Sequence, residues 1–454
     1  MIVAIDRQTR DRDRSAARRE MAERLRGGRT LDSGTRKEKR VTRIATRTLT
    51  CGMTVVIEPM AGVRSCALTW LVPAGAAHDP EDRLGLSTLW AELLMRGAGG
   101  LDSRAHADAC DAIGMSRSAE CGPHFLRISA TMLGDRLLDG LPLLADMVRR
   151  PRFDPDSLEP ARELALMGIE ALKDEPQERC ALLARTRHHP APLNRSVLGT
   201  VEGLGAITQS DVVDGWAARA VPEGSLLGIA GAVDADRTVD ALERLTSGWR
   251  GSRQEPALGP TPARVYHHEQ DDTASQVQIL LMTDGPADPD SNSLLERISA
   301  SVLSGGMSGR LFTEVREKRG LCYSVSASYA ADKRYGTLVA YVGTTPERAQ
   351  ESLDVLSAEL GRIRSAEGRV SKDEFRRAIV GMKSGVVFSG ESTGARAAAI
   401  VSDFYRRGRA RSLGEIAAEI DRVTLDDVNG YLAARQNGAF TIQTLGPKAL
   451  TPPS

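Results

Sequence analysis

The chain has 454 residues, enough for two or three domains with a sizeable buried core. Hydrophobic residues make up 41% and charged residues 26% of the chain, as in soluble globular proteins, and no apolar run approaches the ~18 residues of a membrane-spanning helix. The 60 basic and 60 acidic side chains give zero net charge, which excludes the basic excess typical of nucleic-acid-binding proteins.

The first forty residues differ in composition from the rest. They are rich in Arg, with acidic residues interspersed, and contain almost no large apolar side chains. Such a segment buries too little apolar surface to offset its ordering entropy, so residues 1–40 are predicted to form a disordered or weakly helical extension. The acidic residues disfavour a transit peptide, and the apolar stretch at 1–5 is too short for a signal peptide.

From about residue 41 the pattern becomes regular. A hairpin is predicted over 43–58, turning at Cys51-Gly52. Further strands are predicted over 65–73, 124–132 and 226–233. Apolar residues at helical spacing and capping residues predict helices over 84–96, 103–113 (capped by Ser103), 135–148, 155–173, 177–187, 209–220 and 235–249 (capped by Asp234). Residues 251–262 are rich in Gly, Pro and Ser and are predicted to be a linker.

The second half repeats this order. Strands are predicted over 275–282, 323–331, 337–343 and 441–445. Helices are predicted over 291–303 and 309–319, and from Pro346, Ser371, Thr393, Leu413 and Leu425. Similar residues also recur about 210 positions apart, as in Asp79-Pro80 and Asp288-Pro289. This period is too long for a solenoid repeat and predicts two similar α+β domains that face each other, with a site between them.

Cysteine usage bears on the compartment. Six cysteines are scattered through the chain, and none forms a C-x-x-C pair. They predict no disulfide framework, so a reducing cytoplasm is the expected location.

Three segments resemble those of a known family. They are similar to parts of the insulinase/pitrilysin family of zinc peptidases. The three segments are residues 48–65 (TLTCGMTVVIEPM followed by AGVRS), 196–200 (SVLGT) and 308–325 (SGRLFTEVREKRGLCYSV). The resemblance runs from about residue 41 to 447. It implies two homologous domains, each a mostly antiparallel sheet covered by helices, facing each other across a cleft that closes on an extended peptide.

Active members of that family carry H-x-x-E-H on a first-domain helix. Two His at i and i+4 hold zinc, the Glu between them activates the zinc-bound water, and a later Glu is the third protein ligand. The matching positions here are Thr88, Ala91 and Glu92, and the later Glu falls at Gly168. Because these residues offer neither His ligand nor general base, the family's zinc site is predicted to be absent.

The second-domain signature is present. In the family, an Arg and a Tyr spaced like Arg316 and Tyr323 reach toward the substrate carbonyl, and both are donors suited to a developing oxyanion. Without the resemblance, Arg316 would be one of a run of solvated charges and Tyr323 an ordinary strand aromatic. The resemblance favours the role of Arg316 and Tyr323 as donors to the substrate carbonyl.

Other candidate sites carry weaker signals. His106, Cys110, Cys121 and His124 could form a structural zinc site, although their spacing matches no standard pattern. The pairs His188-His189 and His267-His268 are predicted to be surface loop residues. Ser304-Gly305-Gly306 lacks the Lys-Ser/Thr of a phosphate loop and is predicted to be a connecting loop.

The resulting hypothesis is a zinc-less subunit of a two-chain peptidase. Its domains are predicted at 41–250 and 263–447, with a tail at 448–454. The chain itself has no cofactor, and a homologous H-x-x-E-H-bearing partner carries the zinc. Arg316 and Tyr323 then act in trans on an extended peptide. The alternatives are a non-enzymatic scaffold or peptide-binding member of the family and an autonomous hydrolase that uses other ligands.

Overall fold

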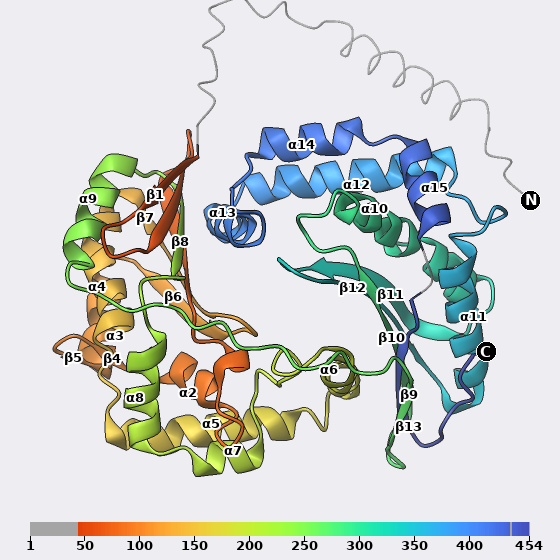
Figure 1. Cartoon of the computed structure of the whole chain (residues 1–454), viewed down its shortest axis with the longest axis horizontal. Helices are drawn as coiled ribbons and strands as arrows, with labels where there is room; N and C mark the ends of the chain where they lie inside the picture. The colour runs from red at the N-terminus through yellow and green to blue at the C-terminus, as the bar shows by residue number, and fades with distance from the viewer. Residues whose placement is uncertain (1–43, 436–437, 454) are drawn as a thin grey trace, which may run out of the picture. The chain divides into compact units, whose positions relative to one another are not determined.

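The computed structural model describes residues 44–435 and 438–453, so the predicted extension at 1–40 lies outside the described residues. These residues form two mainly antiparallel sheets with helices packed on them (Figure 1). The α+β class predicted from the sequence is confirmed.

The first sheet has the strand order β1-β2-β8-β3-β7-β6, and all pairs are antiparallel except β2 with β8. Its strands are β1 (Ala45–Thr48), β2 (Thr54–Pro59), β3 (Ser65–Val72), β6 (Ser116–Cys121), β7 (Leu126–Leu133) and β8 (Leu226–Gly231). A small ribbon is made by β4 (Gly97–Ala98) and β5 (Leu101–Asp102). The helices of this half are α2 (Leu86–Leu93), α3 (Ser103–Ala112), α4 (Leu137–Arg149), α5 (Leu158–Ala171), α6 (Pro176–His188), α7 (Val201–Ala206), α8 (Gln209–Arg219) and α9 (Ala235–Leu245).

The second sheet has the order β11-β12-β10-β13-β9, and only β13 with β9 is parallel. Its strands are β9 (Tyr266–Gln270), β10 (Val277–Gly285), β11 (Cys322–Ala331), β12 (Gly336–Thr344) and β13 (Thr441–Gly446). Its helices are α10 (Ser293–Ser304), the π-helix η4 (Phe312–Glu317), α11 (Ala349–Arg362), α12 (Lys372–Gly390), α13 (Thr393–Arg407), α14 (Leu413–Arg422) and α15 (Leu425–Ala434).

The two sheets share one topology. Strands β2, β8, β3, β7 and β6 of the first sheet correspond in order and direction to β9, β13, β10, β12 and β11 of the second. The single parallel pair lies at the same place in both. The helices recur in the same chain order, so α2, α5 and α6 correspond to α10, α12 and α13. This is the arrangement that the sequence duplication predicts.

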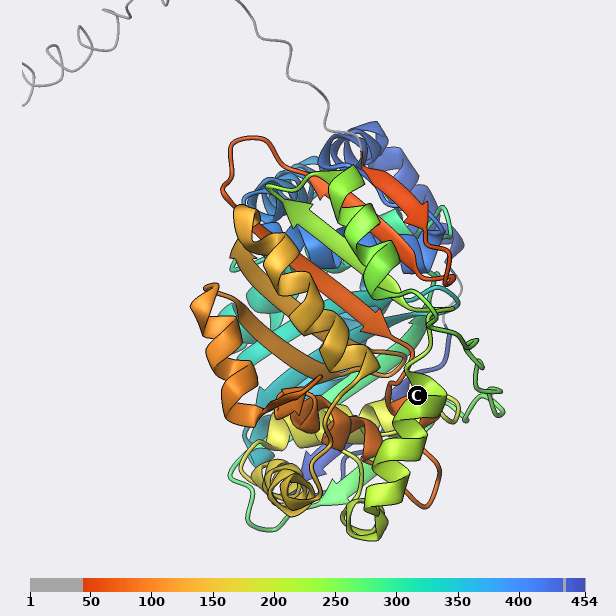
Figure 2. The same cartoon turned by 90° about the vertical axis from the view of Figure 1, so that its left-hand side faces the viewer.

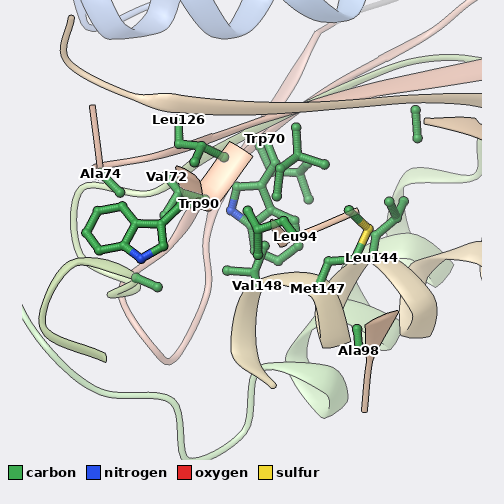
Figure 3. Close-up of a cluster of buried hydrophobic side chains, with 14 of the residues drawn as sticks. Trp70, Val72, Ala74, Trp90, Leu94, Ala98, Leu126, Leu144, Met147 and Val148 are labelled. Atoms are coloured by element: carbon green, nitrogen blue, oxygen red, sulfur yellow. The ribbon is translucent and has the colours of Figure 1, made fainter. Parts of the chain in front are cut away.

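The core of the first half lies between its sheet and helices α2, α4 and α9. Figure 2 shows α4 and α9 in front of the sheet. Two tryptophans anchor this core although aromatic residues are few: Trp70 on β3 and Trp90 on α2 are each 1% exposed. They pack among Leu94, Leu144 and Met147 (Figure 3). The Trp90 indole N–H donates to the Val212 carbonyl oxygen of α8 at 3.0 Å, so the aromatic bulk is buried with its polar atom satisfied.

Each sheet is also covered by one helix from the other half of the chain. Helix α13 lies against β2, β3 and β8 of the first sheet, and α6 lies against β10 and β13 of the second (Figure 1). Small residues permit the close approach. A Cβ at Gly228 of β8 would clash with the Ala397 carbonyl and Val401 of α13, and the fully buried Cys180 of α6 faces the second sheet. We call α6 and α13 the exchanged helices.

Several local predictions are corrected. Asp102, rather than Ser103, caps α3, since its carboxylate accepts the Ala105 N–H at 2.8 Å. The helix predicted over 309–319 is a shorter π-helix, η4. Strands β6 and β9 were not predicted because they are short and carry many polar residues, and helix α7 was not predicted because it has only six residues, two of them glycines.

Candidate functional site

The N-terminus of α2 is fixed by a buried carboxylate. Asp79 is 3% exposed and accepts the backbone N–H groups of Gly85 at 3.0 Å and Ser87 at 3.1 Å, together with the Ser87 hydroxyl. Gly85 takes φ 109°, which a residue with a side chain rarely adopts. Orphan N–H groups at the helix start are thus satisfied, and the residues one turn later are held in place.

The four positions matched to the family's zinc site lie on two neighbouring helices, because α2 packs against α5. The Thr88 hydroxyl donates to the Val197 carbonyl oxygen, and Glu92 pairs with Arg96 at 2.8 Å. Ala91 packs against the core, whereas Gly168 is exposed and a Cβ there would meet no atom within 4 Å. The polar side chains at these positions, Thr88 and Glu92, therefore each have a hydrogen-bond or ion-pair partner nearby in the first half. Among the residues that the structure describes, no three His, Cys, Asp or Glu side chains are grouped to hold a metal ion.

Two residues that were not predicted as part of this site lie beside Thr88. Cys121, at the end of β6, faces Ser87, Thr88 and Asp79, and burial raises the pKa of its thiol to about 12, so the thiol stays protonated. Burial also raises the pKa of Asp79 to about 6, although its hydrogen bonds from Ser87 and Gly85 act in the opposite direction. The repeated Asp-Pro pair was the only sequence signal for Asp79.

The Asp79 carboxyl is expected to make stability depend on pH. Its folded-state pKa of about 6 exceeds the ~3.9 of an unfolded Asp, so the native state binds the proton more tightly. The contribution of this tighter proton binding to the free energy of unfolding is fully present below about pH 4 and is lost as the pH rises toward 6. Relative to Asp79→Asn, the wild type should lose about 3 kcal/mol of unfolding free energy between pH 4 and 7. Urea unfolding of both proteins across this range measures the difference. If the wild type instead becomes more stable relative to Asp79→Asn as the pH rises, the folded protein favours the ionised carboxylate and the prediction is contradicted.

Arg316 and Tyr323 both lie on local irregularities of the second half. Arg316 is exposed on the π-helix η4, with its guanidinium 5.0 Å from the centre of the Phe312 ring. Tyr323 is 73% exposed on edge strand β11, where the pairing with β12 shifts register between Cys322 and Ser324. π-helices are rare, and bulges redirect side chains, and both are frequent at functional sites. Two exposed donors are thus presented on adjacent elements, since η4 packs against β11.

Arg310 fastens this segment to the rest of the second half. Its side chain is buried and donates to the Gly368 carbonyl at 2.6 Å, to the Arg369 carbonyl at 3.0 Å and to both oxygens of Glu374 at 2.6 and 2.9 Å. A buried guanidinium with four acceptors holds the start of η4 rigidly. Sequence reasoning did not single out Arg310, although it stands within the SGRLF segment that carries the resemblance.

The weaker candidates have other environments. His106 and Cys110 are neighbours on α3, with 4.0 Å between Nδ1 and Sγ. Cys121 lies beside Thr88, and His124 packs against Tyr335 and Tyr405. The four therefore do not form a metal site.

The loop predictions are wrong for His188 and for the pair His267-His268, whereas His189 lies in the bend that follows α6. His188 ends α6 and is completely buried against the second sheet, where its Nδ1 lies 3.0 Å from the Thr441 hydroxyl. His267 and His268 lie within strand β9 rather than in a loop. Both pairs are therefore structural.

Two models of one peptidase family match consecutive parts of the chain. The model of insulinase (peptidase family M16) matches residues 54–201, and that of the peptidase M16 inactive domain matches residues 206–382. The chain belongs to the insulinase family. It is a member that lacks the family's zinc motif, since Thr88, Ala91 and Glu92 stand where H-x-x-E-H is expected. No described helix of this insulinase-family chain has both the length and the apolar character needed to cross a membrane.

Similar proteins span nearly the whole chain. An uncharacterised zinc protease of Mycobacterium leprae is 27% identical over 426 residues, which cover 91% of this chain and 94% of the relative. The crystal structure of a peptidase M16 inactive domain from Pseudomonas fluorescens matches with a TM-score of 0.78 and 20% identity, covering 90% of this chain and 99% of that one. A chain of complex III2 from Candida albicans, with Inz-5 bound, matches with a TM-score of 0.76 and 18% identity, covering 89% of this chain and 96% of that one. These structures share the insulinase-family fold.

This insulinase-family member is predicted to bind no stoichiometric zinc. The reason is the set of residues at the four matched positions, which supplies neither imidazole nor thiolate and leaves Glu92 paired with Arg96. Metal analysis of the purified chain after dialysis measures the content. One tightly held zinc ion per chain would contradict the prediction.

Proposed function

We propose that this chain is the zinc-less, substrate-binding subunit of a two-chain metallopeptidase. Arg316 and Tyr323 contact the substrate carbonyl, and a homologous H-x-x-E-H-bearing partner completes the site. Within this proposal the two peptidase-like domains cover residues 41–250 and 263–447, joined by the linker 251–262. The pair works in the cytoplasm, with which the six free thiols are consistent.

The observation that carries the proposal is the exposure of both donors on irregular backbone. A π-helix and a β-bulge are less favourable than regular structure, and a scaffold needs neither at these positions. Tyr323 has no buried packing role, being 73% exposed, and Arg316 has no carboxylate partner among the described residues. Tyr323 also lies on an edge strand, so an extended peptide that reaches β11 meets its hydroxyl directly.

The proposed chemistry divides between the two chains. The partner's zinc ion would supply an activated water, which this chain cannot generate because Ala91 stands at the general-base position. The guanidinium of Arg316 and the hydroxyl of Tyr323 would donate to the carbonyl oxygen as negative charge develops on it. Fixed donors of this kind act mainly on the transition state.

Reconstitution tests the proposal. The chain is mixed with a homologous H-x-x-E-H-bearing chain from the same organism, and single-turnover cleavage of a flexible quenched peptide is followed. Cleavage is expected only from the mixture. Cleavage by this chain alone would favour the autonomous hydrolase, and equal cleavage by the partner alone would leave this chain without a role.

A non-catalytic, peptide-binding scaffold is the second candidate. It is favoured by the local engagement of Thr88 with Val197 and of Glu92 with Arg96, which gives the former zinc positions a structural role. A scaffold would co-purify with its partner yet leave the turnover of that partner unchanged. The same assay therefore separates the two candidates.

A further inference from the structure

A cavity of about 670 Å³ lies between α10, α12, α13 and α14 of the second half. Helices α10 and α12 are the counterparts of α2 and α5, the two helices that carry the degenerate zinc positions. Arg297, which lines the cavity, follows Asp288 at the spacing at which Thr88 follows Asp79. The cavity thus occupies, in the second repeat, the place that the zinc positions have in the first. The side chains that line this cavity differ from those at the zinc positions, because many of them are arginines.

Arginines dominate the polar part of the cavity wall: Arg297, Arg396, Arg406, Arg407, Arg411 and Arg422. Most of them are paired with carboxylates. Arg396 binds Glu58 outside the cavity at 2.7 Å, Arg407 binds Asp288 at 2.7 Å, and Arg411 binds Asp403 at 2.7 Å.

Arg406 is the exception among the half-buried arginines of this wall. Among the described residues it has no hydrogen-bond or ion-pair partner. Arg297 must share Asp288 with Arg407, and its own distance to that carboxylate is 3.5 Å. Burial lowers the pKa of Arg297, and the nearby charges of Arg406 and Arg407 act in the same direction. The carboxylates that face the six arginines are Asp288, Asp290, Asp403 and Glu419 of the cavity wall and Glu58, the partner of Arg396. Six positive charges thus meet five negative ones, which leaves one positive charge uncompensated.

One part of the wall is apolar. It is formed by Leu294 of α10, Met382 and Val386 of α12, and Ile416 and Ile420 of α14. A volume of several hundred Å³ with one apolar wall and a few convergent polar groups is typical of small-molecule sites. A simple inorganic anion would satisfy the arginines and leave this apolar wall uncovered.

We propose that this cavity binds an organic carboxylate with a medium-length apolar chain, whose carboxylate lies on Arg406 and Arg297 and whose chain covers the wall of α12 and α14. One carboxylate supplies the negative charge that Arg406 lacks. Guanidinium groups bind carboxylates in a two-pronged geometry, and the chain removes apolar surface from water. The site is separate from the Arg316 and Tyr323 segment and does not depend on the proposed peptidase role.

Calorimetric titration of the full-length chain tests this proposal. The probes are octanoate, the uncharged octanamide and the chainless acetate. We expect octanoate to bind at one per chain and the other two at least about tenfold more weakly, because each lacks one of the two interactions. Equal binding of octanamide, or no heat from octanoate at millimolar concentration, would overturn the proposal.

Two variants locate the site. Arg406→Gln should weaken octanoate binding about tenfold or more. Gly385→Leu should abolish it, because Gly385 lines the cavity and a Cβ there meets no atom within 4 Å. Leu also has the higher helix propensity, so this variant should melt no lower than the wild type. Arg376→Gln is the matched control, since Arg376 is exposed, pairs with Asp373 and does not line the cavity. Unchanged octanoate affinity in Arg406→Gln and Gly385→Leu would place the ligand elsewhere and contradict the proposal.

Discussion

Replacing Arg316 by Ala or Tyr323 by Phe in the reconstituted pair should lower the rate of peptide cleavage about 10²–10³-fold, the usual effect of removing one oxyanion donor. Assembly with the partner should be unchanged, because both side chains are exposed and neither packs in the core. Single-turnover cleavage measures the rate, and size-exclusion chromatography measures assembly. The double variant should lose less than the product of the single losses, since both donors serve one oxygen.

Two matched controls accompany this experiment. Lys318→Ala changes a neighbouring exposed cation that pairs with Glu314, and Glu92→Ala removes only the pair with Arg96. Both should stay within a few-fold of the wild type. Full activity in the Arg316→Ala/Tyr323→Phe double variant would remove the catalytic role and leave the scaffold.

The second large effect is expected at the ion pair between the two halves. Arg396 of α13 is 1% exposed and donates to Glu58 of β2 at 2.7 Å. Arg396→Met leaves a buried carboxylate without a partner, so we expect the free energy of unfolding to fall by about 3–5 kcal/mol. Urea unfolding followed by circular dichroism measures the loss.

A double variant separates the pair from the packing around it. Arg396→Met with Glu58→Leu removes both charges and should recover most of the lost stability, because an apolar pair of similar volume often replaces a buried ion pair without loss. Arg376→Met is the control, since its pair with Asp373 is exposed and is worth at most about 1 kcal/mol. A loss below about 1 kcal/mol in the Arg396→Met single variant would contradict the prediction that this buried pair is important for stability.

Local sequence signals predicted most helices of the second half. The helices predicted from Ser371, Leu413 and Leu425 are present as α12, α14 and α15. In the structure each of them begins with a capping box, formed by Ser371/Glu374, Ser412/Glu415 and Thr424/Asp427. Strands β6 (SRSAEC) and β9 (YHHEQ) escaped prediction because both are edge strands. An edge strand tolerates polar residues on both faces, so neither alternation nor an apolar run marks it.

The candidate site was predictable only in part. The positions Thr88, Ala91, Glu92 and Gly168 followed from the family resemblance, and the structure places them on neighbouring helices. The π-helix and the bulge that present Arg316 and Tyr323 have no sequence signal, since they arise from tertiary contacts such as those of Arg310. His188 was misplaced for a similar reason. Its buried position depends on a sheet formed by residues from about 266 onward, and no local pattern reveals that neighbour.

The exchanged helices have a consequence for synthesis on the ribosome. The first sheet is complete in sequence once β8 has emerged, yet the helix that covers its inner face begins only at Thr393. Until then Leu71, Phe125 and Leu226, which pack against Val401 in the finished molecule, face water. The nascent chain therefore carries an open apolar face through the translation of more than a hundred further residues. Each half completes the other, and neither is finished before nearly the whole chain has been made.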